Sequence, residues 1–295
     1  MTHSVNYNRR TVSGQRFVEI SKSLFVDADF EQLFRKLGLT SIEAVFSFSA
    51  GRNLVKKNLA GYRSRLELET DPLGTTLFLK RYNKPPALVQ IKNWLSHRSR
   101  KSFGLAEFAS VSQLSAAGVN TPKTVAYGEQ VGVFFEKRSF IIIQRIPNAE
   151  SLERKLPAFF TGPATAEKLK LRRNFIARFA AFIRKFHQTN YRHRDLYFSH
   201  IFYDDSGTFY LIDLARAFKP VLLVERFRIK DIAQLYYSAP GAYFSGTDRL
   251  RFYLGYVQTG KLTGKDKSFI RKVVGKAQQM ARRNARHGRS APFAR

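Results

Sequence analysis

The feature that most constrains the fold is a change of hydrophobic periodicity at Pro147. Before it, short β-rich runs are separated by turn sequences such as LAGY and DPLG, which is typical of antiparallel strands. After it, apolar residues recur at helical spacing, most clearly in AEKLKLRRNFIARFAAFIRKFHQ over residues 166–188. The sequence therefore predicts an α+β protein with an N-terminal antiparallel sheet part and a mostly helical C-terminal part.

The N-terminal half is expected to hold several strands and one long helix. Three successive strands are predicted between Ala44 and Tyr82, the first of them in AVFSFSAGRNLVKK. A basic helix or loop over 92–104 precedes a helix over 105–119, which has stop signals at its end. Two or three further strands follow. After residue 188, two small β runs, SHIFYD and TFYLID, are joined by the turn DSG.

The domain organisation follows from these shifts in pattern. We expect a basic extension over residues 1–43 with one short amphipathic helix, the sheet lobe over 44–146, and the helical lobe over 147–262. A basic helix and tail over 263–295 complete the chain. The long helix should bury one face, which includes Leu171.

The composition is strongly basic. The chain has 295 residues, with 51 Lys and Arg against 22 Asp and Glu, a formal charge of +29. Such an excess indicates a polyanionic partner: nucleic acid, an anionic membrane surface or a phosphorylated substrate. The chain has no cysteine, which excludes disulfides and thiolate metal sites. Its longest apolar runs, FAAFI and FIII, are far shorter than the roughly 18 to 20 residues of a membrane span. The first twenty residues do not predict a signal peptide.

Two aspartates stand where chemistry is expected. Asp195 follows the long helix in YRHRDLYFSHIFYDD, and Asp213 ends the second small β run in LIDLAR. Phosphoryl transfer needs one carboxylate to orient the attacking hydroxyl and accept its proton, and another to hold Mg²⁺ against the phosphates. A single aspartate beside a strand usually caps a turn. The two together, after this helix and around this hairpin, favour the catalytic interpretation, and the order of strands before helices is that of a two-lobed kinase.

The segments HRDLYFSHIFYD and LIDLARA resemble the catalytic and metal-binding segments of the lipopolysaccharide core kinases. These Kdo and heptose kinases are a bacterial branch of the protein-kinase-like fold, and the resemblance extends over roughly Ala44 to Lys261. It implies transfer of phosphate from ATP, with Mg²⁺, to a Kdo or heptose hydroxyl of the lipopolysaccharide inner core. It also implies a cytoplasmic enzyme, peripheral at the inner membrane, whose partners are the lipid A-core acceptor and the anionic membrane surface.

The resemblance assigns roles to five residues. Lys80 stands where a lysine grips the nucleotide phosphates, and Glu107 where a helical glutamate pairs with that lysine. Asp195 corresponds to the catalytic carboxylate and Asp213 to the Mg²⁺ ligand. Asp231, in RIKDIAQL, corresponds to an acid that braces the catalytic loop.

His200 departs from the protein-kinase pattern, which has asparagine there, and agrees with the lipopolysaccharide kinases. Mg²⁺ prefers oxygen ligands, so an imidazole is a poor substitute for the asparagine amide. We expect His200 to bind a phosphate or orient Asp195 instead, and it is a candidate residue of both the catalytic and the metal site. The spacing of His187, His193 and His200 matches no common zinc site, so the first two are expected to be structural.

Nucleotide contacts are only weakly specified. No G-x-G-x-x-G loop is present, and the turn KKNLAGYRS offers Gly61 with Asn58 and basic side chains for phosphate. Backbone groups of Gln144 to Ile146 stand where a kinase-like fold meets adenine. Asp213 is followed by Leu-Ala instead of Phe-Gly, so no regulated activation loop is expected.

Other functions stay open at this point. They are a small-molecule phosphotransferase, an atypical protein kinase, and a pseudokinase or nucleic-acid-binding module, although we do not expect nucleic acid as the partner. The basic tail from Lys276 to Arg295 would either dock on anionic lipid or pack on the helical lobe.

Overall fold

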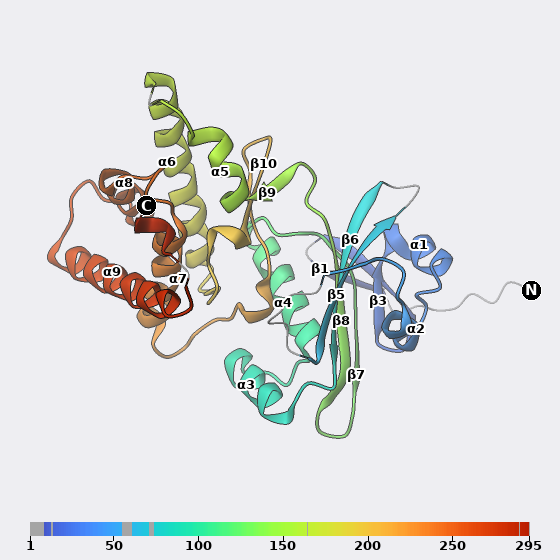
Figure 1. Ribbon diagram of the computed structural model, residues 1–295. Coiled ribbons are helices and arrows are strands. Elements are labelled where there is room, and N and C mark those ends of the chain that lie inside the picture. Colours follow the sequence, from blue (N-terminus) through green and yellow to red (C-terminus); the bar gives the residue numbers. More distant parts are fainter. Residues whose placement is uncertain are drawn as a thin grey trace, which may run out of the picture. The chain divides into compact units, whose positions relative to one another are not determined.

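A single antiparallel sheet organises the first half of the chain (Figure 1). The computed structural model describes residues 9–12, 14–54, 61–70, 74–163, 165–288 and 290–294. The chain forms two compact units, Met1–Ile146 and Pro147–Arg295, which we call the sheet unit and the helical unit.

Eight strands of the sheet unit pair in the order β1-β2-β3-β7-β8-β6-β5-β4. Their bounds are β1 Arg9–Val12, β2 Gln15–Ser21, β3 Leu24–Asp27, β4 Arg52–Asn53, β5 Arg63–Thr70, β6 Thr75–Asn83, β7 Thr124–Val131 and β8 Glu136–Gln144. Strand β8 lies between β7 and β6, and Phe140, Ile141 and Ile142 are all fully buried. This burial on both faces explains why FIII is a continuous apolar run.

The extension expected over residues 1–43 belongs to the sheet. It contains strands β1 to β3, and Phe17, Leu24 and Val26 are fully buried in the core. The segment is polar on average, so its few alternating apolar residues did not stand out in the sequence. Strand β3 attaches the segment to β7. The short amphipathic helix is confirmed as α1, Glu31–Lys36, after the 3₁₀ turn η1, Ala28–Phe30.

The first strand predicted between Ala44 and Tyr82 is present as β4, Arg52–Asn53, which pairs antiparallel with β5. Its predicted start at Ala44 is wrong, because that part of the segment forms helix α2, Ile42–Ser47. The Ser41 hydroxyl caps the helix by accepting the Ala44 amide at 3.1 Å. Ile42 and Val45 are buried three positions apart, as on one helix face. Phe46 and Phe48 alternate with Ser47 and Ser49, so the sequence also fitted a strand here.

Helix α4, Phe103–Ala116, confirms the helix expected over 105–119, and α3, Ala87–His97, is the basic helix before it. Of the helices α1 to α4 of the sheet unit, only α2 was not expected as a helix. The first turn of α4 lies close to β8, since a Cβ at Gly104 would be 2.6 Å from the Phe140 carbonyl oxygen. Glycine is needed at that point of contact.

The helical unit begins with β9 and five helices follow in its described residues. Their bounds are α5 Leu152–Phe160, α6 Ala166–Gln188, α7 Val224–Ser238, α8 Gly246–Val257 and α9 Gly264–Ala285. Helix α6 has the predicted bounds, although Leu171 is exposed. The expected hairpin is β10, Ile201–Asp204, with β11, Phe209–Leu211; β9, Ala149–Ser151, joins it as an unpredicted third strand.

The C-terminal segment packs on the helical unit. Helix α9 lies against α7 and buries Phe269, Val273 and Ala277. In the 3₁₀ turn η4, Pro292–Ala294, the Phe293 ring is 5.4 Å from that of Tyr236. These contacts favour the packing alternative for the tail; Arg289 and Arg295 lie outside the described residues. None of the helices in the described part of the chain has the length and apolar character to cross a membrane.

Candidate active site

The sheet unit holds a buried ion pair between β6 and α4. Lys80 Nζ lies 2.5 Å from Glu107 Oε1, and the two side chains are only 8% and 2% exposed. The Tyr82 hydroxyl donates to the other oxygen of Glu107 at 3.3 Å. Removing either charge would break a buried ion pair, which is strongly destabilising. The expected pairing of Lys80 with Glu107 is thus present in the structure.

A second buried carboxylate, Glu136, holds the start of α4 and was not predicted. It accepts the Phe103 amide at 2.9 Å and the Ser139 hydroxyl, which itself accepts the Gly104 amide at 2.9 Å. These bonds satisfy amides that have no partner within the first turn of the helix. Burial raises the pKa of Glu136 to about 7, although both hydrogen bonds oppose the shift. Glu136 therefore anchors the helix that carries Glu107.

The predicted nucleotide contacts lie at two other places in the sheet unit. Gln144 ends β8, which pairs with the Lys80 strand, and its amide donates to the Lys123 carbonyl at 2.9 Å. The Ile146 side chain is buried. Gly61 precedes β5 and has open space at its Cβ position, whereas Asn58 lies outside the described residues. Their roles toward a nucleotide stay predictions.

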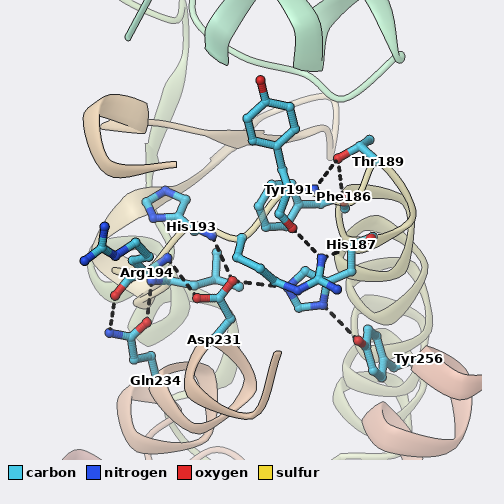
Figure 2. Close-up of polar contacts among 11 residues, drawn as sticks. Phe186, His187, Thr189, Tyr191, His193, Arg194, Asp231, Gln234 and Tyr256 are labelled. Carbon is cyan, nitrogen blue, oxygen red and sulfur yellow. Dashed lines mark hydrogen bonds and ion pairs between the residues drawn. The ribbon is translucent and has the colours of Figure 1, made fainter. Parts of the chain in front are cut away.

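In the helical unit, Asp231 on α7 is fully buried beneath the loop that follows α6 (Figure 2). Its carboxylate accepts the His193 amide at 2.8 Å and the Arg194 amide at 2.9 Å. His187 Nε2 lies 3.3 Å from the same carboxylate, and its Nδ1 lies 2.8 Å from the Tyr256 hydroxyl. Burial lowers the pKa of His187 and of His193, so both rings are neutral at pH 7. The bracing expected of Asp231 is confirmed.

Two more side chains of α7 bind the same loop and were missed from the sequence. Gln234 accepts the Leu196 amide at 2.9 Å and donates to the Arg194 carbonyl at 2.8 Å (Figure 2). Ser238 accepts the Phe198 amide at 3.1 Å. Residues 231, 234 and 238 share one helix face, and this spacing was the available signal. The backbone on both sides of Asp195 is therefore held by one helix.

The Asp195 carboxylate is engaged by Arg216, a residue that sequence reasoning did not single out. Arg216 Nη1 donates to Oδ1 at 2.9 Å and to Oδ2 at 2.7 Å. Lys230 is close enough to Asp195 for the two charges to interact. Burial is the main cause that lowers the pKa of Lys230; Arg216 and Arg194 lower it further, and Asp195 raises it. Asp195 is thus surrounded by cations.

His200 contacts the Asp195 backbone and not its carboxylate. His200 Nδ1 lies 2.7 Å from the Asp195 carbonyl oxygen, which can only accept, so Nδ1 carries the proton. Nε2 is then 3.9 Å from Oδ2 of Asp213. Asp213 follows β11 in a left-handed conformation with φ +57°. The structure thus brings Asp195, His200 and Asp213 together within the helical unit.

Comparisons with known proteins extend these observations. Residues 62–256 match the family model described as "Lipopolysaccharide kinase (Kdo/WaaP) family". The chain is 28% identical over 234 residues to the lipopolysaccharide core heptose(I) kinase WaaP of Escherichia coli strain K12, covering 76% of this chain and 87% of that one. It is 26% identical over 269 residues to the protein of the same name from Pseudomonas aeruginosa, covering 88% and 97%.

A relative with a different acceptor name is the 3-deoxy-D-manno-octulosonic acid kinase of Vibrio vulnificus, 28% identical over 128 residues, 43% of this chain and 47% of that one. Among solved structures, "WaaP in complex with acyl carrier protein" is similar with a TM-score of 0.65 and 23% identity, over 88% of this chain and 99% of that chain. This likeness confirms the predicted fold class.

Proposed function

Because the chain belongs to the lipopolysaccharide kinase (Kdo/WaaP) family, we propose that it transfers the γ-phosphate of ATP to a sugar hydroxyl of the lipopolysaccharide inner core. A heptose is the preferred acceptor, since the relatives with the broader coverage are named heptose(I) kinases. Kdo is the alternative, because the relative matched over 43% of this chain bears that name.

The observation that carries the proposal is the rigid placement of Asp195. Its loop is bound to Asp231, Gln234 and Ser238 of α7, so its backbone has little freedom to move. A carboxylate has about four lone-pair directions, and Arg216 uses two of them. The remaining ones can accept the acceptor hydroxyl and then its proton. Asp195 is therefore assigned as the catalytic carboxylate.

We assign Lys80 to the nucleotide phosphates, with Glu107 holding its ammonium in place. Backbone groups near Gly61 would contact phosphate, and those of Gln144 to Ile146 would contact adenine. These four assignments rest on the family resemblance and on the pairing of β6, which carries Lys80, with β8.

Asp213 is the residue that we assign to Mg²⁺, and His200 is its neighbour. Bound Mg²⁺ neutralises the charge of the phosphates. The described residues contain no group of three or more His, Asp or Glu side chains that could hold a metal ion. One carboxylate fits Mg²⁺ if phosphate oxygens and water complete its shell. Nε2 of His200 lies beside Asp213, where it can form a hydrogen bond with such a water.

The test is phosphorylation by the purified protein with ATP and Mg²⁺. Inner-core acceptors that end in Kdo alone or carry heptose would be analysed by mass spectrometry for the gain of one phosphate. Asp195→Asn should fold, bind ATP and lose about 10²- to 10⁴-fold in rate. Phosphate on a small-molecule alcohol or a protein but on neither sugar acceptor would overturn the assigned substrate. Wild-type turnover by Asp195→Asn would overturn the assigned carboxylate.

We also propose that the enzyme works at the cytoplasmic face of the inner membrane, bound to its surface. The formal charge of +29 supports attraction to anionic lipid, to which each nearby Lys or Arg contributes about 1 kcal/mol. The acceptor is itself a lipid-linked, anionic sugar chain.

An acyl carrier protein is a second proposed partner. A cavity of about 270 Å³ lies within the helical unit, lined mainly by apolar side chains that include Phe175, Phe179, Leu235, Phe252 and Val273. Such a lining suits an acyl chain, and the solved relative was studied with an acyl carrier protein. Melting temperatures with acylated and unacylated carrier protein test this partner. Equal melting curves with both forms would argue against use of the cavity.

A further inference from the structure

Helix α3 of the sheet unit buries polar side chains and exposes apolar ones, the reverse of an ordinary amphipathic helix. Its polar residues Gln90 and Asn93 are buried, with Gln90 only 2% exposed. Leu88, Ile91 and Leu95 lie on the exposed side, and the two leucines are 72% and 74% exposed. Positions 88, 91 and 95 share one face of a helix. An apolar stripe therefore points away from the core of this unit.

The orientation of α3 is held by specific contacts. The Gln90 amide group donates to the carbonyl oxygens of Pro85 at 2.7 Å and Glu136 at 3.2 Å, and its oxygen accepts the Glu136 amide at 2.8 Å. The Trp94 ring stacks on Phe135 with centroids 5.4 Å apart. Turning the helix to bury its leucines would break these bonds and leave buried polar groups without partners. The exposed stripe is thus a consequence of the fold.

The turn between β7 and β8 adds to this surface. Val131, Val133 and Phe134 are exposed, the last two by 91% and 74%. The turn is joined to α3 by the Trp94 stack on Phe135, and Figure 1 shows α3 beside the end of this hairpin. We call the six side chains the apolar surface: Leu88, Ile91, Leu95, Val131, Val133 and Phe134.

The charged residues in the chain around α3 are all basic. No Asp or Glu occurs between Asp71 and Glu107, whereas seven Lys and Arg do. Several of these are exposed beside the apolar stripe: Lys84, Lys92, Arg98 and Arg100. On the hairpin Lys137 is exposed, Glu136 is buried, and Glu129 is a partly exposed acid. Exposed apolar residues flanked by cations are the composition of elements that lie in the interface of an anionic bilayer.

We propose that α3 and the β7–β8 turn dock the sheet unit on an anionic lipid surface. The exposed leucines, Ile91, Val133 and Phe134 would enter the boundary between head groups and acyl chains, and the flanking cations would bind lipid phosphates. The inference rests on the proposed function, in which the enzyme acts on a lipid-linked acceptor. It adds the site at which that enzyme would contact the membrane. It also assigns that contact to the sheet unit and not to the basic tail, which packs on α7.

The test is co-sedimentation of the full chain with vesicles of phosphatidylcholine alone or with added phosphatidylglycerol. The variant Leu88→Ser/Ile91→Ser/Leu95→Ser changes exposed side chains, so its melting temperature should stay that of the wild type. Its apparent affinity for the anionic vesicles should fall by about 10-fold or more. A matched control, Val221→Ser/Leu222→Ser, removes two exposed apolar side chains before α7 and should bind as wild type.

The electrostatic part is tested with Lys92→Gln/Lys137→Gln, which should weaken binding at low salt and have little effect at high salt. Undiminished vesicle binding by the triple serine variant would overturn the proposal. So would a wild-type dimer that this variant makes monomeric, because the surface would then bind a second copy of the chain.

The kinase proposal is tested separately by two further measurements. Asp195→Asn should bind vesicles as wild type, and the triple serine variant should phosphorylate a delipidated acceptor normally. Suppose that neither the wild type nor any variant phosphorylates an acceptor, while vesicle binding follows the expected pattern. The kinase assignment would then be refuted, and the proposed docking surface would stand.

Discussion

Replacing Glu136 by glutamine should change the pH dependence of stability of the sheet unit. The carboxyl group has a pKa of about 7 in the folded protein, against an ordinary value of 4.5. Between these values the unfolded chain loses the proton that the folded chain keeps. The free energy of unfolding therefore falls by about 1.4 kcal/mol per pH unit, and the full loss above pH 7 is about 3 kcal/mol. The glutamine side chain cannot ionise, so the Glu136→Gln variant should escape this loss.

Two buried histidines act in the opposite direction. His187 and His193 have pKa values lowered by burial, so the unfolded chain takes up protons at these positions first as the pH falls below 6.5. Their contribution to stability is complete above pH 6.5 and is lost on acidification. Both histidines belong to the helical unit and are present in both proteins. The difference between wild type and Glu136→Gln consequently isolates the carboxyl group.

The assay is urea unfolding at several pH values between 4.5 and 8, followed by tryptophan fluorescence. The chain has one tryptophan, Trp94, which is packed in the sheet unit beside Glu136 and reports on that unit. Glu43→Gln, at an exposed position of α2, is the matched control. The Glu136→Gln variant should gain stability relative to wild type as the pH rises. A flat difference, or one that grows toward acid pH, would refute the reasoning.

Four other substitutions test the site. Glu107→Gln should lower the free energy of unfolding by about 3 to 5 kcal/mol, because it breaks the buried ion pair with Lys80, and denaturant titration measures this. Asp213→Asn should weaken Mg²⁺-dependent nucleotide binding, seen as a smaller rise in melting temperature with ATP and Mg²⁺ than with wild type. His200→Asn should not raise activity, and full activity with an unchanged Mg²⁺ dependence would show that the imidazole has no special role. Arg216→Gln should change stability by less than about 1 kcal/mol, since the pair is partly exposed, yet slow phosphorylation; an unaltered rate would remove Arg216 from the site.

Local sequence was sufficient where one short stretch contains the whole signal. Helix α6 has its predicted bounds, because the apolar residues of 166–188 repeat at 3.6-residue spacing and Thr165 caps the start. The hairpin after it follows from the turn DSG between two apolar runs. Asp195 and Asp213 could be chosen because their surroundings in the sequence, a helix before them and a hairpin between them, match the requirements of phosphoryl transfer.

The tertiary structure decided what each local pattern packs against. Strands β1 to β3 belong to the sheet because β3 pairs with β7, more than ninety positions along the chain. Helix α3 exposes its leucines because Gln90 is hydrogen-bonded to the Glu136 backbone. The contacts around Asp195 also depend on the tertiary structure. Gln234 binds the Leu196 amide from 38 positions away, and Arg216 binds the Asp195 carboxylate from 21 positions away. Periodicity reports which side of an element is apolar. It carries no information about which distant side chain will satisfy a buried amide or carboxylate, and that choice determines the active-site loop.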